Sequence, residues 1–376
     1  MNPKTNRENH WRSILRRVAL LLLTCALGRS VIAAEKAFRP GEVWPDNNGV
    51  HINCHGGGIL VHDGTFYWFG QHMVEGRPGN LAQVGVHVYS SKHLYDWKDE
   101  GIALRVSEDP QSDIAKGCIL ERPKVIYNRK TNKFVMWFHL ELKGKGYRTA
   151  RSGVAVADQA IGPYRFIESF RPNVGVWPIN VPDELKEQLP AKGGPAPKFL
   201  FQRDFAEGQM ARDMTLFVDE DETAYHIYAS EGNSTLHISQ LTDDYLRPAG
   251  KYARVFPDGF NEAPAMFKHA GKYYLITSGC SGWRPNAARL GVADSIWGPW
   301  QALGNPCVGE DAELTFHGQS TYVLPVPGKT GAFIFMADRW KPGNPIDGRY
   351  LWLPIQFKDG KPFVAWLDKW DLSFFK

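Results

Sequence analysis

The stretch Gly259–Gly279, GFNEAPAMFKHAGKYYLITSG, contains the pattern that decides the fold. It places a carboxylate, Glu262, in a short loop before Pro264, and an apolar run at Ala265–Lys268, a polar turn and a second apolar run at Lys272–Ser278 follow. Two such runs joined by a turn predict a β-hairpin. A carboxylate held at the mouth of a strand pair can be shielded from water, as a general acid requires. Taken alone, Glu262 is equally consistent with a solvated loop residue.

The second, aromatic-rich strand of this hairpin recurs five times along the chain. The five copies are Thr65–Gly70, Lys133–His139, Thr223–Ser230, Lys272–Ser278 and Gly331–Asp338. A short apolar strand and a polar turn precede each copy, and a further strand follows it. Closing five small sheets around an axis removes the open edges that would otherwise aggregate. The repeat therefore predicts an all-β fold, a five-bladed β-propeller, whereas the alternative, a β-sandwich, would not predict a recurrence across the whole chain.

Length and composition agree with one large β-domain after the N-terminus. The chain has 376 residues, of which 13% are aromatic and 22% charged, so a disordered chain is not expected. We assign residues 34–376 to a single propeller. One insertion, residues 169–204, is rich in Pro and Gly, with a short helix expected at Asp183–Gln188. It is either a lid or cleft wall, or a solvated loop without a role.

The first 33 residues have the features of a secretory signal peptide. Arg12, Arg16 and Arg17 precede an apolar run that is too short to span a membrane, and Val31-Ile32-Ala33 is a small-residue cleavage pattern. We therefore expect a secreted or periplasmic protein. These residues carry a net charge of +5 against +4 for the whole chain, so without them the net charge is −1. Nucleic-acid binding has no electrostatic support in such a chain.

Four cysteines remain after cleavage: Cys54, Cys118, Cys280 and Cys307. An exported protein could pair them, or all four could be small buried residues. No Cys/His spacing typical of a metal site occurs, so we expect no cofactor and no metal in the site. A structural cation on the propeller axis remains compatible with the sequence.

Four polar residues stand at corresponding places, at or just before the first strand of successive units: Glu121, Asp213, Glu262 and Gln319. In a propeller the innermost strands all begin at the same end of the axis, so these side chains are expected to converge in one pocket. Converging carboxylates fit glycoside cleavage. One protonated carboxyl donates to the leaving oxygen, a second group handles water, and a further carboxylate raises the pKa of the acid.

These residues lie in the motifs ERPKV, RD, EAP and GQST, which resemble in this order glycoside hydrolase family 43, and most closely its exo-β-1,3-galactanase branch. The resemblance covers about residues 45–370. It implies that Glu262 is the general acid and that Asp213 orients it and tunes its pKa. Most of the family has a base Asp in the first blade, where this chain has His55-Gly56-Gly57-Gly58. The galactanase branch shares that loss, and there a Gln, matched by Gln319, holds the water.

The resemblance also implies substrate contacts. Glu121 would bind a sugar hydroxyl with support from Arg122, and the other pocket candidates are Tyr147, Asn233, Ser281, Trp283 and Asn286. Trp283 is either a stacking platform for a sugar or a packed core indole. Gln71 stands where the galactanase branch tends to have Glu, and a carboxylate-to-amide change alters which hydroxyls are held.

The sequence therefore predicts an exported, inverting glycoside hydrolase that acts from a chain end on β-linked galactose-containing glycans. An arabinofuranosidase or xylosidase activity is one alternative, and a carbohydrate-binding propeller without catalysis is another, because the usual base Asp is missing. The expected partner is an oligo- or polysaccharide. We expect a monomer with no membrane span.

Overall fold

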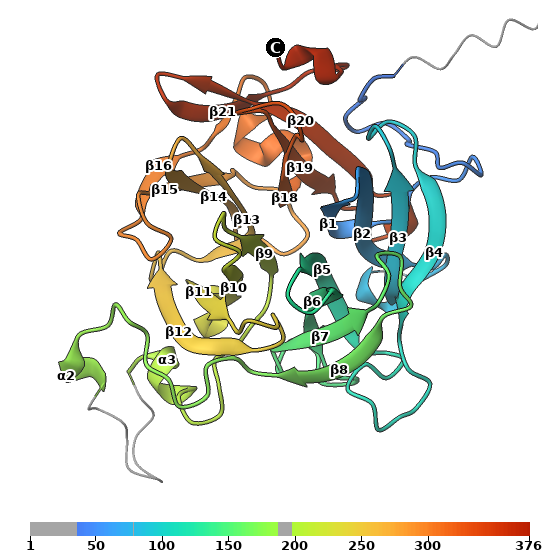
Figure 1. Ribbon diagram of the computed structural model, residues 1–376. Helices are drawn as coiled ribbons and strands as arrows, with labels where there is room; N and C mark the ends of the chain where they lie inside the picture. The colour runs from blue at the N-terminus through green and yellow to red at the C-terminus, as the bar shows by residue number, and fades with distance from the viewer. Residues whose placement is uncertain (1–35, 78, 187–197) are drawn as a thin grey trace, which may run out of the picture. The chain divides into compact units, whose positions relative to one another are not determined.

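In the computed structural model, which describes residues 36–77, 79–186 and 198–376, the strands form five small sheets around a central axis (Figure 1). The chain is thus an all-β, five-bladed propeller, as the repeat predicted. Ala37–Lys376 forms one unit by its internal contacts. The predicted signal peptide, residues 1–33, and the end of the helix predicted at Asp183–Gln188 lie outside the described residues.

Each of the first four sheets contains four strands that pair in chain order. Blade one comprises β1 (His55–His62), β2 (Thr65–Met73), β3 (Gln83–Ser91) and β4 (Lys98–Arg105). Blade two comprises β5 (Ile119–Asn128), β6 (Lys133–Glu141), β7 (Arg151–Ala157) and β8 (Arg165–Phe170). Blade three comprises β9 (Met214–Val218), β10 (Ala224–Ser230), β11 (Thr235–Leu241) and β12 (Pro248–Val255). Blade four comprises β13 (Asn261–His269), β14 (Lys272–Gly279), β15 (Arg289–Ala293) and β16 (Gln301–Gly304).

Blade five has an extra strand and the order β17-β21-β20-β19-β18. Its strands are β17 (Cys307–Val308), β18 (Gln319–Pro325), β19 (Phe333–Arg339), β20 (Arg349–Lys358) and β21 (Lys361–Ala365). The C-terminal strand β21 pairs antiparallel with β20 and parallel with β17, at the outer side of its own blade.

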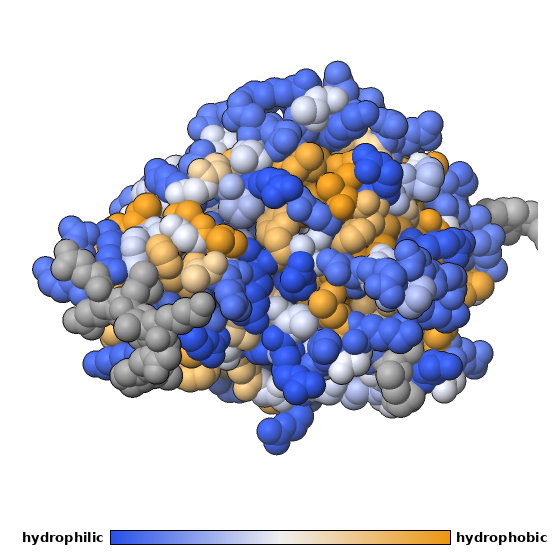
Figure 2. All heavy atoms as spheres, turned by 90° about the horizontal axis from the view of Figure 1, so that it is seen from below, coloured by the Kyte–Doolittle hydropathy of each residue, from blue (hydrophilic) through white to orange (hydrophobic). Residues whose placement is uncertain are grey.

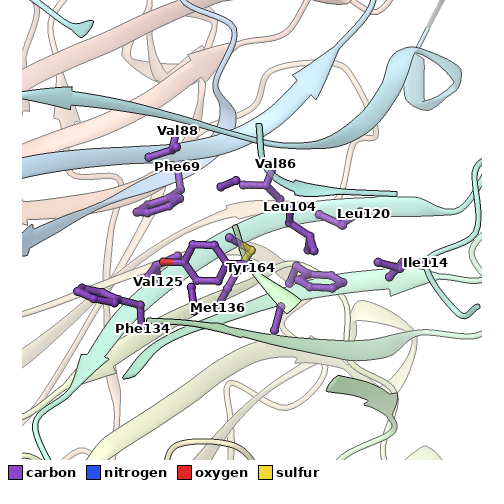
Figure 3. Close-up of a cluster of buried hydrophobic side chains, with 14 of the residues drawn as sticks. Phe69, Val86, Val88, Leu104, Ile114, Leu120, Val125, Phe134, Met136 and Tyr164 are labelled. Carbon is purple, nitrogen blue, oxygen red and sulfur yellow. The ribbon is translucent and has the colours of Figure 1, made fainter. Parts of the chain in front are cut away.

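Five hydrophobic clusters lie between neighbouring blades, which is where the core sits. Figure 3 shows the cluster between blades one and two, in which Phe69 and Val86 face Met136 and Phe134. The alternation of each strand explains this arrangement, because successive side chains point to opposite faces of a sheet and so enter different clusters. Burying one such aromatic or aliphatic side chain stabilises the fold by about 1.5–3 kcal/mol.

Aromatic packing closes the ring between blades five and one. Trp68 of β2 and Trp352 of β20 lie with ring centroids 4.8 Å apart in the cluster at this junction. The chain ends meet there too, since the Phe38 N–H donates to the Trp370 carbonyl at 2.7 Å and their rings lie 4.4 Å apart. Blades one and five are separate sheets, so side-chain packing and a few backbone hydrogen bonds join them, among them that from the Gly79 N–H to the Pro342 carbonyl at 2.8 Å.

The insertion between β8 and β9 packs on the outer edge of blade three. Its described part contains α2 (Asp183–Lys186) and α3 (Leu200–Arg203), and Phe201 is fully buried beneath the Arg254 guanidinium. The Ile179 N–H donates to the Tyr252 carbonyl on β12, the outermost strand. This part of the insertion covers a sheet edge, and none of its described residues lines the cavity at the axis.

The four cysteines of the described residues are free; Cys54, Cys118 and Cys307 are buried and Cys280 is exposed. Within the described residues, no helix has the length and apolar character needed to cross a membrane. On the face seen in Figure 2, hydrophobic residues lie in separate patches among hydrophilic ones.

Gly70 on β2 is required by a close approach of two backbones. A Cβ at this position would lie 2.2 Å from the carbonyl carbon of Cys54. We expect Gly70→Ala to lower the free energy of unfolding by about 3 kcal/mol or more, because backbone atoms have to move. Thermal unfolding measures this. The control is Gly343→Ala, whose Cβ would meet nothing within 4 Å; equal melting temperatures for the two variants would contradict the expectation.

Candidate active site

The inner strands of four blades carry a β-bulge at the end that faces the site. The pairing register shifts after His55 in β1, after Glu121 in β5, after Glu262 in β13 and after Ser320 in β18. In the first three the next residue has a positive φ: 63° at Gly56, 54° at Arg122 and 53° at Ala263. A bulge re-aims a side chain and ends regular pairing, so Glu121 and Glu262 are turned toward the axis by the same device.

A cavity of about 350 Å³ lies where these strands begin, and its walls come from all five blades. Its lining residues are Gln71, Glu121, Arg122, His139, Tyr147, Arg212, Asp213, Asn233, Glu262, Cys280, Gly282, Trp283, Gln319 and Trp340. The structure thus brings together the four polar residues predicted to converge.

Glu262 is held by two donors. Its Oε1 accepts a hydrogen bond from Nε2 of Gln319 at 3.1 Å, and its Oε2 accepts one from Nδ2 of Asn233 at 3.2 Å. Burial first, and then the negative charge of Asp213, raise the pKa of Glu262 to about 7, against the opposing effects of the Arg122 cation and of the hydrogen bonds to Glu262. Glu262 therefore carries a proton at mildly acidic pH, which a general acid must do.

Asp213 lies against the residue that follows Glu262. Its Oδ2 accepts from the backbone N–H of Ala263 at 3.1 Å and is 3.0 Å from Nη2 of Arg122. Arg122 is 6% exposed in its side chain, so Asp213 is the charge partner that makes this burial tolerable. Asp213 thus combines two effects on its neighbour: it is a like charge near Glu262, and it holds the Arg122 cation in place.

The carboxamide of Gln319 has all four of its hydrogen-bonding positions occupied. Its oxygen accepts from Nη2 of Arg122 and from Nε1 of Trp340 at 3.1 Å. Its Nε2 donates to Glu262 and, at 2.9 Å, to Oγ of Ser278. Because the oxygen faces two obligate donors, this orientation of the amide is the only one that satisfies them. Gln319 therefore orients Glu262 in the structure.

Two indoles form the aromatic side of the cavity. Trp283 and Trp340 meet edge to face, with ring centroids 5.6 Å apart, and the Arg122 guanidinium lies 5.4 Å from the Trp340 ring. Trp283 is 41% exposed, so it is not the packed core indole that the sequence left open. Exposed indole faces are suited to stack on a sugar ring.

Gln71 reaches the cavity from β2, next to the Gly56 bulge. It is 2% exposed, and its side chain makes no hydrogen bond within the described residues. A Cβ on Gly56 would lie 2.6 Å from its Oε1, so the glycine leaves room for the amide. Because Gln71 lines the cavity, its amide is available to hydrogen-bond a substrate group.

Two predicted contacts are placed elsewhere. Ser281 does not line the cavity, and Asn286 lines only a small neighbouring hollow. Asn286 bonds the backbone N–H and carbonyl of Gly279 and the Ser281 hydroxyl. The two residues therefore brace the loop that carries Trp283.

Sequence reasoning missed five lining residues, His139, Arg212, Cys280, Gly282 and Trp340. One signal was available for His139: it ends the second aromatic strand and pairs across the hairpin with Glu121.

Glu121, His139 and Asp213 have ligand atoms within 4.8 Å of one another, close enough to hold a metal ion. The imidazole does not suit that role. Its Nδ1 lies 3.0 Å from Oε2 of Glu121 and its Nε2 lies 3.0 Å from Oε1 of Glu141. Both nitrogens therefore donate to carboxylates and neither offers a lone pair.

A five-bladed propeller whose axis holds a half-buried carboxyl of raised pKa, further carboxylates and an indole wall has the architecture of a glycoside hydrolase. The family model for glycosyl hydrolases family 43 matches residues 197–362. A solved β-1,3-galactosidase of family 43, with galactodeoxynojirimycin, is 56% identical with a TM-score of 0.82, over 89% of this chain and 100% of that one. This chain belongs to glycoside hydrolase family 43.

Two more distant relatives are also similar. The exo-β-1,3-galactanase of Phanerochaete chrysosporium, solved with β-1,3-galactotriose, is 31% identical with a TM-score of 0.72, and the match covers 90% of this chain and 68% of that one. The β-D-galactofuranosidase xynD of Aspergillus niger is 30% identical over 129 residues. That match covers 31% of this chain and 37% of the fungal enzyme.

Proposed function

We propose that this enzyme releases galactose from the end of β-1,3-linked galactan chains, by inversion. The observation that carries the proposal is Glu262, a half-buried carboxyl with a raised pKa inside a cavity that residues of all five blades surround. The names of the similar galactosidase and galactanase supply the sugar and the linkage.

In the proposed reaction Glu262 donates its proton to the glycosidic oxygen as the bond to the leaving sugar breaks. Asp213 keeps that proton on Glu262 until the substrate is bound. Gln319 has the role of positioning the attacking water. Since its four positions are occupied, it must exchange its contact to Ser278 or to Glu262 for the water when substrate enters.

A substrate panel tests the proposal. The full chain is incubated with β-1,3-galactobiose and β-1,3-galactotriose, and with aryl β-xyloside, α-L-arabinofuranoside and β-D-galactofuranoside. The last substrate is included because of the Aspergillus niger relative. We expect galactose from the β-1,3 substrates at a kcat/KM well above that for any furanoside. Furanoside cleavage without galactobiose cleavage would favour the alternative activity. Binding without any product would favour a propeller that has lost catalysis.

The pH dependence follows from the state that Glu262 must be in. The acid is competent only when protonated, and its pKa is raised to about 7, so kcat/KM should be lost as pH rises through about 7, about tenfold per unit above it. Asp338, buried beside Gly56, also has a pKa raised to about 7. The control is therefore Asp338→Asn, which should keep the same alkaline limb. A profile that stays flat to pH 9 would contradict the assignment.

We propose that catalysis needs no metal ion. Both His139 nitrogens are engaged, and near the axis Nζ of Lys124 donates to the Gly56 carbonyl at 2.8 Å, so a protein donor already occupies that oxygen. We expect prolonged treatment with EDTA to leave kcat and the melting temperature unchanged. Loss of either, restored by Ca²⁺, would show that a cation is bound.

We further propose export and a monomeric state. Export rests on the signal-like residues 1–33. Expression of the full chain in a bacterial host, followed by N-terminal sequencing of the periplasmic protein, should show cleavage after Ala33. A full-length cytoplasmic product would contradict export, and size-exclusion chromatography with light scattering tests the monomer.

A further inference from the structure

His139, which the proposed reaction does not use, is buried between two carboxylates. Its side chain is 1% exposed and lies on β6, directly across the hairpin from Glu121. The Nδ1 faces Glu121 and the Nε2 faces Glu141, each at 3.0 Å. Because carboxylate oxygens only accept, both ring nitrogens carry hydrogen. Burial alone would lower the pKa of His139, but the two carboxylates outweigh it and raise the pKa to about 9.

Glu141 links this histidine to the loop at 142–150. Its side chain is fully buried, and Oε2 accepts from the Thr149 N–H at 2.7 Å, the Thr149 hydroxyl at 2.7 Å and the Ala150 N–H at 2.9 Å. Three donors on one oxygen fix the end of the loop just before β7 begins. The loop therefore cannot move independently of Glu141.

Tyr147, in the same loop, contacts Glu121 directly. Its hydroxyl donates to Oε1 of Glu121 at 2.6 Å, and its carbonyl accepts from Nη2 of Arg212 at 2.6 Å. The hydrogen bonds thus form a closed circuit from Glu121 through His139, Glu141 and the loop to Tyr147 and back. Arg122, Arg212 and Asp213 lie beside this circuit on the cavity side, and Arg171 donates to the carbonyls of Thr149 and Arg148 in the loop.

We propose that His139 and Glu141 are positioning residues that act through Glu121, fixing its carboxylate and the Tyr147 loop as one preformed wall that receives the terminal sugar. Each Glu121 oxygen already accepts one hydrogen bond, so its plane is set before substrate arrives and its remaining acceptor positions face the cavity. A preformed wall lowers the cost of ordering these groups on binding. This inference rests on the proposed function of the same pocket.

The test is a double-mutant cycle on KM for β-1,3-galactobiose with the full chain. In His139→Gln the amide nitrogen falls near the place of Nε2, so the donor to Glu141 is kept and the donor to Glu121 is lost. Tyr147→Phe removes the other donor to Glu121. We expect each change to raise KM about tenfold with a smaller effect on kcat, and the double variant to raise it far less than the product of the two factors.

The matched control pairs His139→Gln with Trp283→Phe, whose ring packs on Trp340 and is not a member of the circuit; these factors should multiply. If His139→Gln does not fold, two variants take its place: His139→Asn, which keeps the donor to Glu121, and Glu141→Gln. The effect of Glu141→Gln on KM should then couple to that of Tyr147→Phe in the same way. The inference would be overturned if the increases in KM multiplied for both pairs, His139 with Tyr147 and Glu141 with Tyr147, or if KM did not change. An inactive wild-type chain would instead overturn the proposed function.

Discussion

Glu262→Gln is expected to lower kcat on β-1,3-galactobiose by about 10³- to 10⁴-fold while the chain still folds. The substitution preserves the shape of the side chain but removes the proton that the leaving sugar needs. It also adds a small mismatch. Both contacts of Glu262 come from donors, Nε2 of Gln319 and Nδ2 of Asn233, so the new amide nitrogen must face one of them.

The choice of leaving group separates lost acid catalysis from general damage. An activated substrate such as β-galactosyl fluoride needs little protonation, so Glu262→Gln should retain far more of its activity on the fluoride than on galactobiose. Thermal unfolding of the variant serves as the folding control. Equal losses on the two substrates in a folded variant would show that Glu262 does something other than donate a proton.

Asp213→Asn is expected to lower kcat/KM at pH 7 by about 10²-fold or more and to move the alkaline limb to lower pH. The negative charge of Asp213 helps to raise the pKa of Glu262, and the Arg122 cation lowers it. Removing the negative charge of Asp213 leaves the effect of the Arg122 cation unopposed. The pKa of Glu262 therefore falls, and less of this acid is protonated at neutral pH. The loss should therefore shrink as the pH is lowered.

The same change should destabilise the fold. Arg122 is buried and Asp213 is its partner at 3.0 Å, and removing one partner of a buried pair costs about 3–5 kcal/mol. The full pH profile of kcat/KM, measured below the melting temperature of the variant, checks the catalytic effect. An alkaline limb that stays at the wild-type pH would show that Asp213 does not tune Glu262.

The strands were predictable because their signal is local. The aromatic run Lys272–Ser278 and the apolar run before it form β13 and β14 nearly as expected, since turn residues and alternation fix a hairpin without help from distant chain. The parallel strand β17 was not predictable. It has two residues and exists because β21, far along the chain, lies beside it.

The site also contains residues that the sequence could predict and residues that it could not. The convergence of Glu121, Asp213, Glu262 and Gln319 followed from the repeat, because equivalent positions in a propeller share one end of the axis. Trp340 lies in no such position, and Ser281 was assigned to the pocket from resemblance although it braces a loop. The contacts of His139 depend on the loop at 142–150 folding back, which no pattern within β6 indicates.

The anomeric form of the first product tests the central claim most directly. The full chain is mixed with β-1,3-galactotriose and followed by proton NMR before the released sugar mutarotates. The account predicts α-galactose and β-1,3-galactobiose as the first products, since a single displacement at a chain end inverts the anomeric carbon. β-Galactose as the first product, or initial cleavage that releases no monosaccharide, would contradict it.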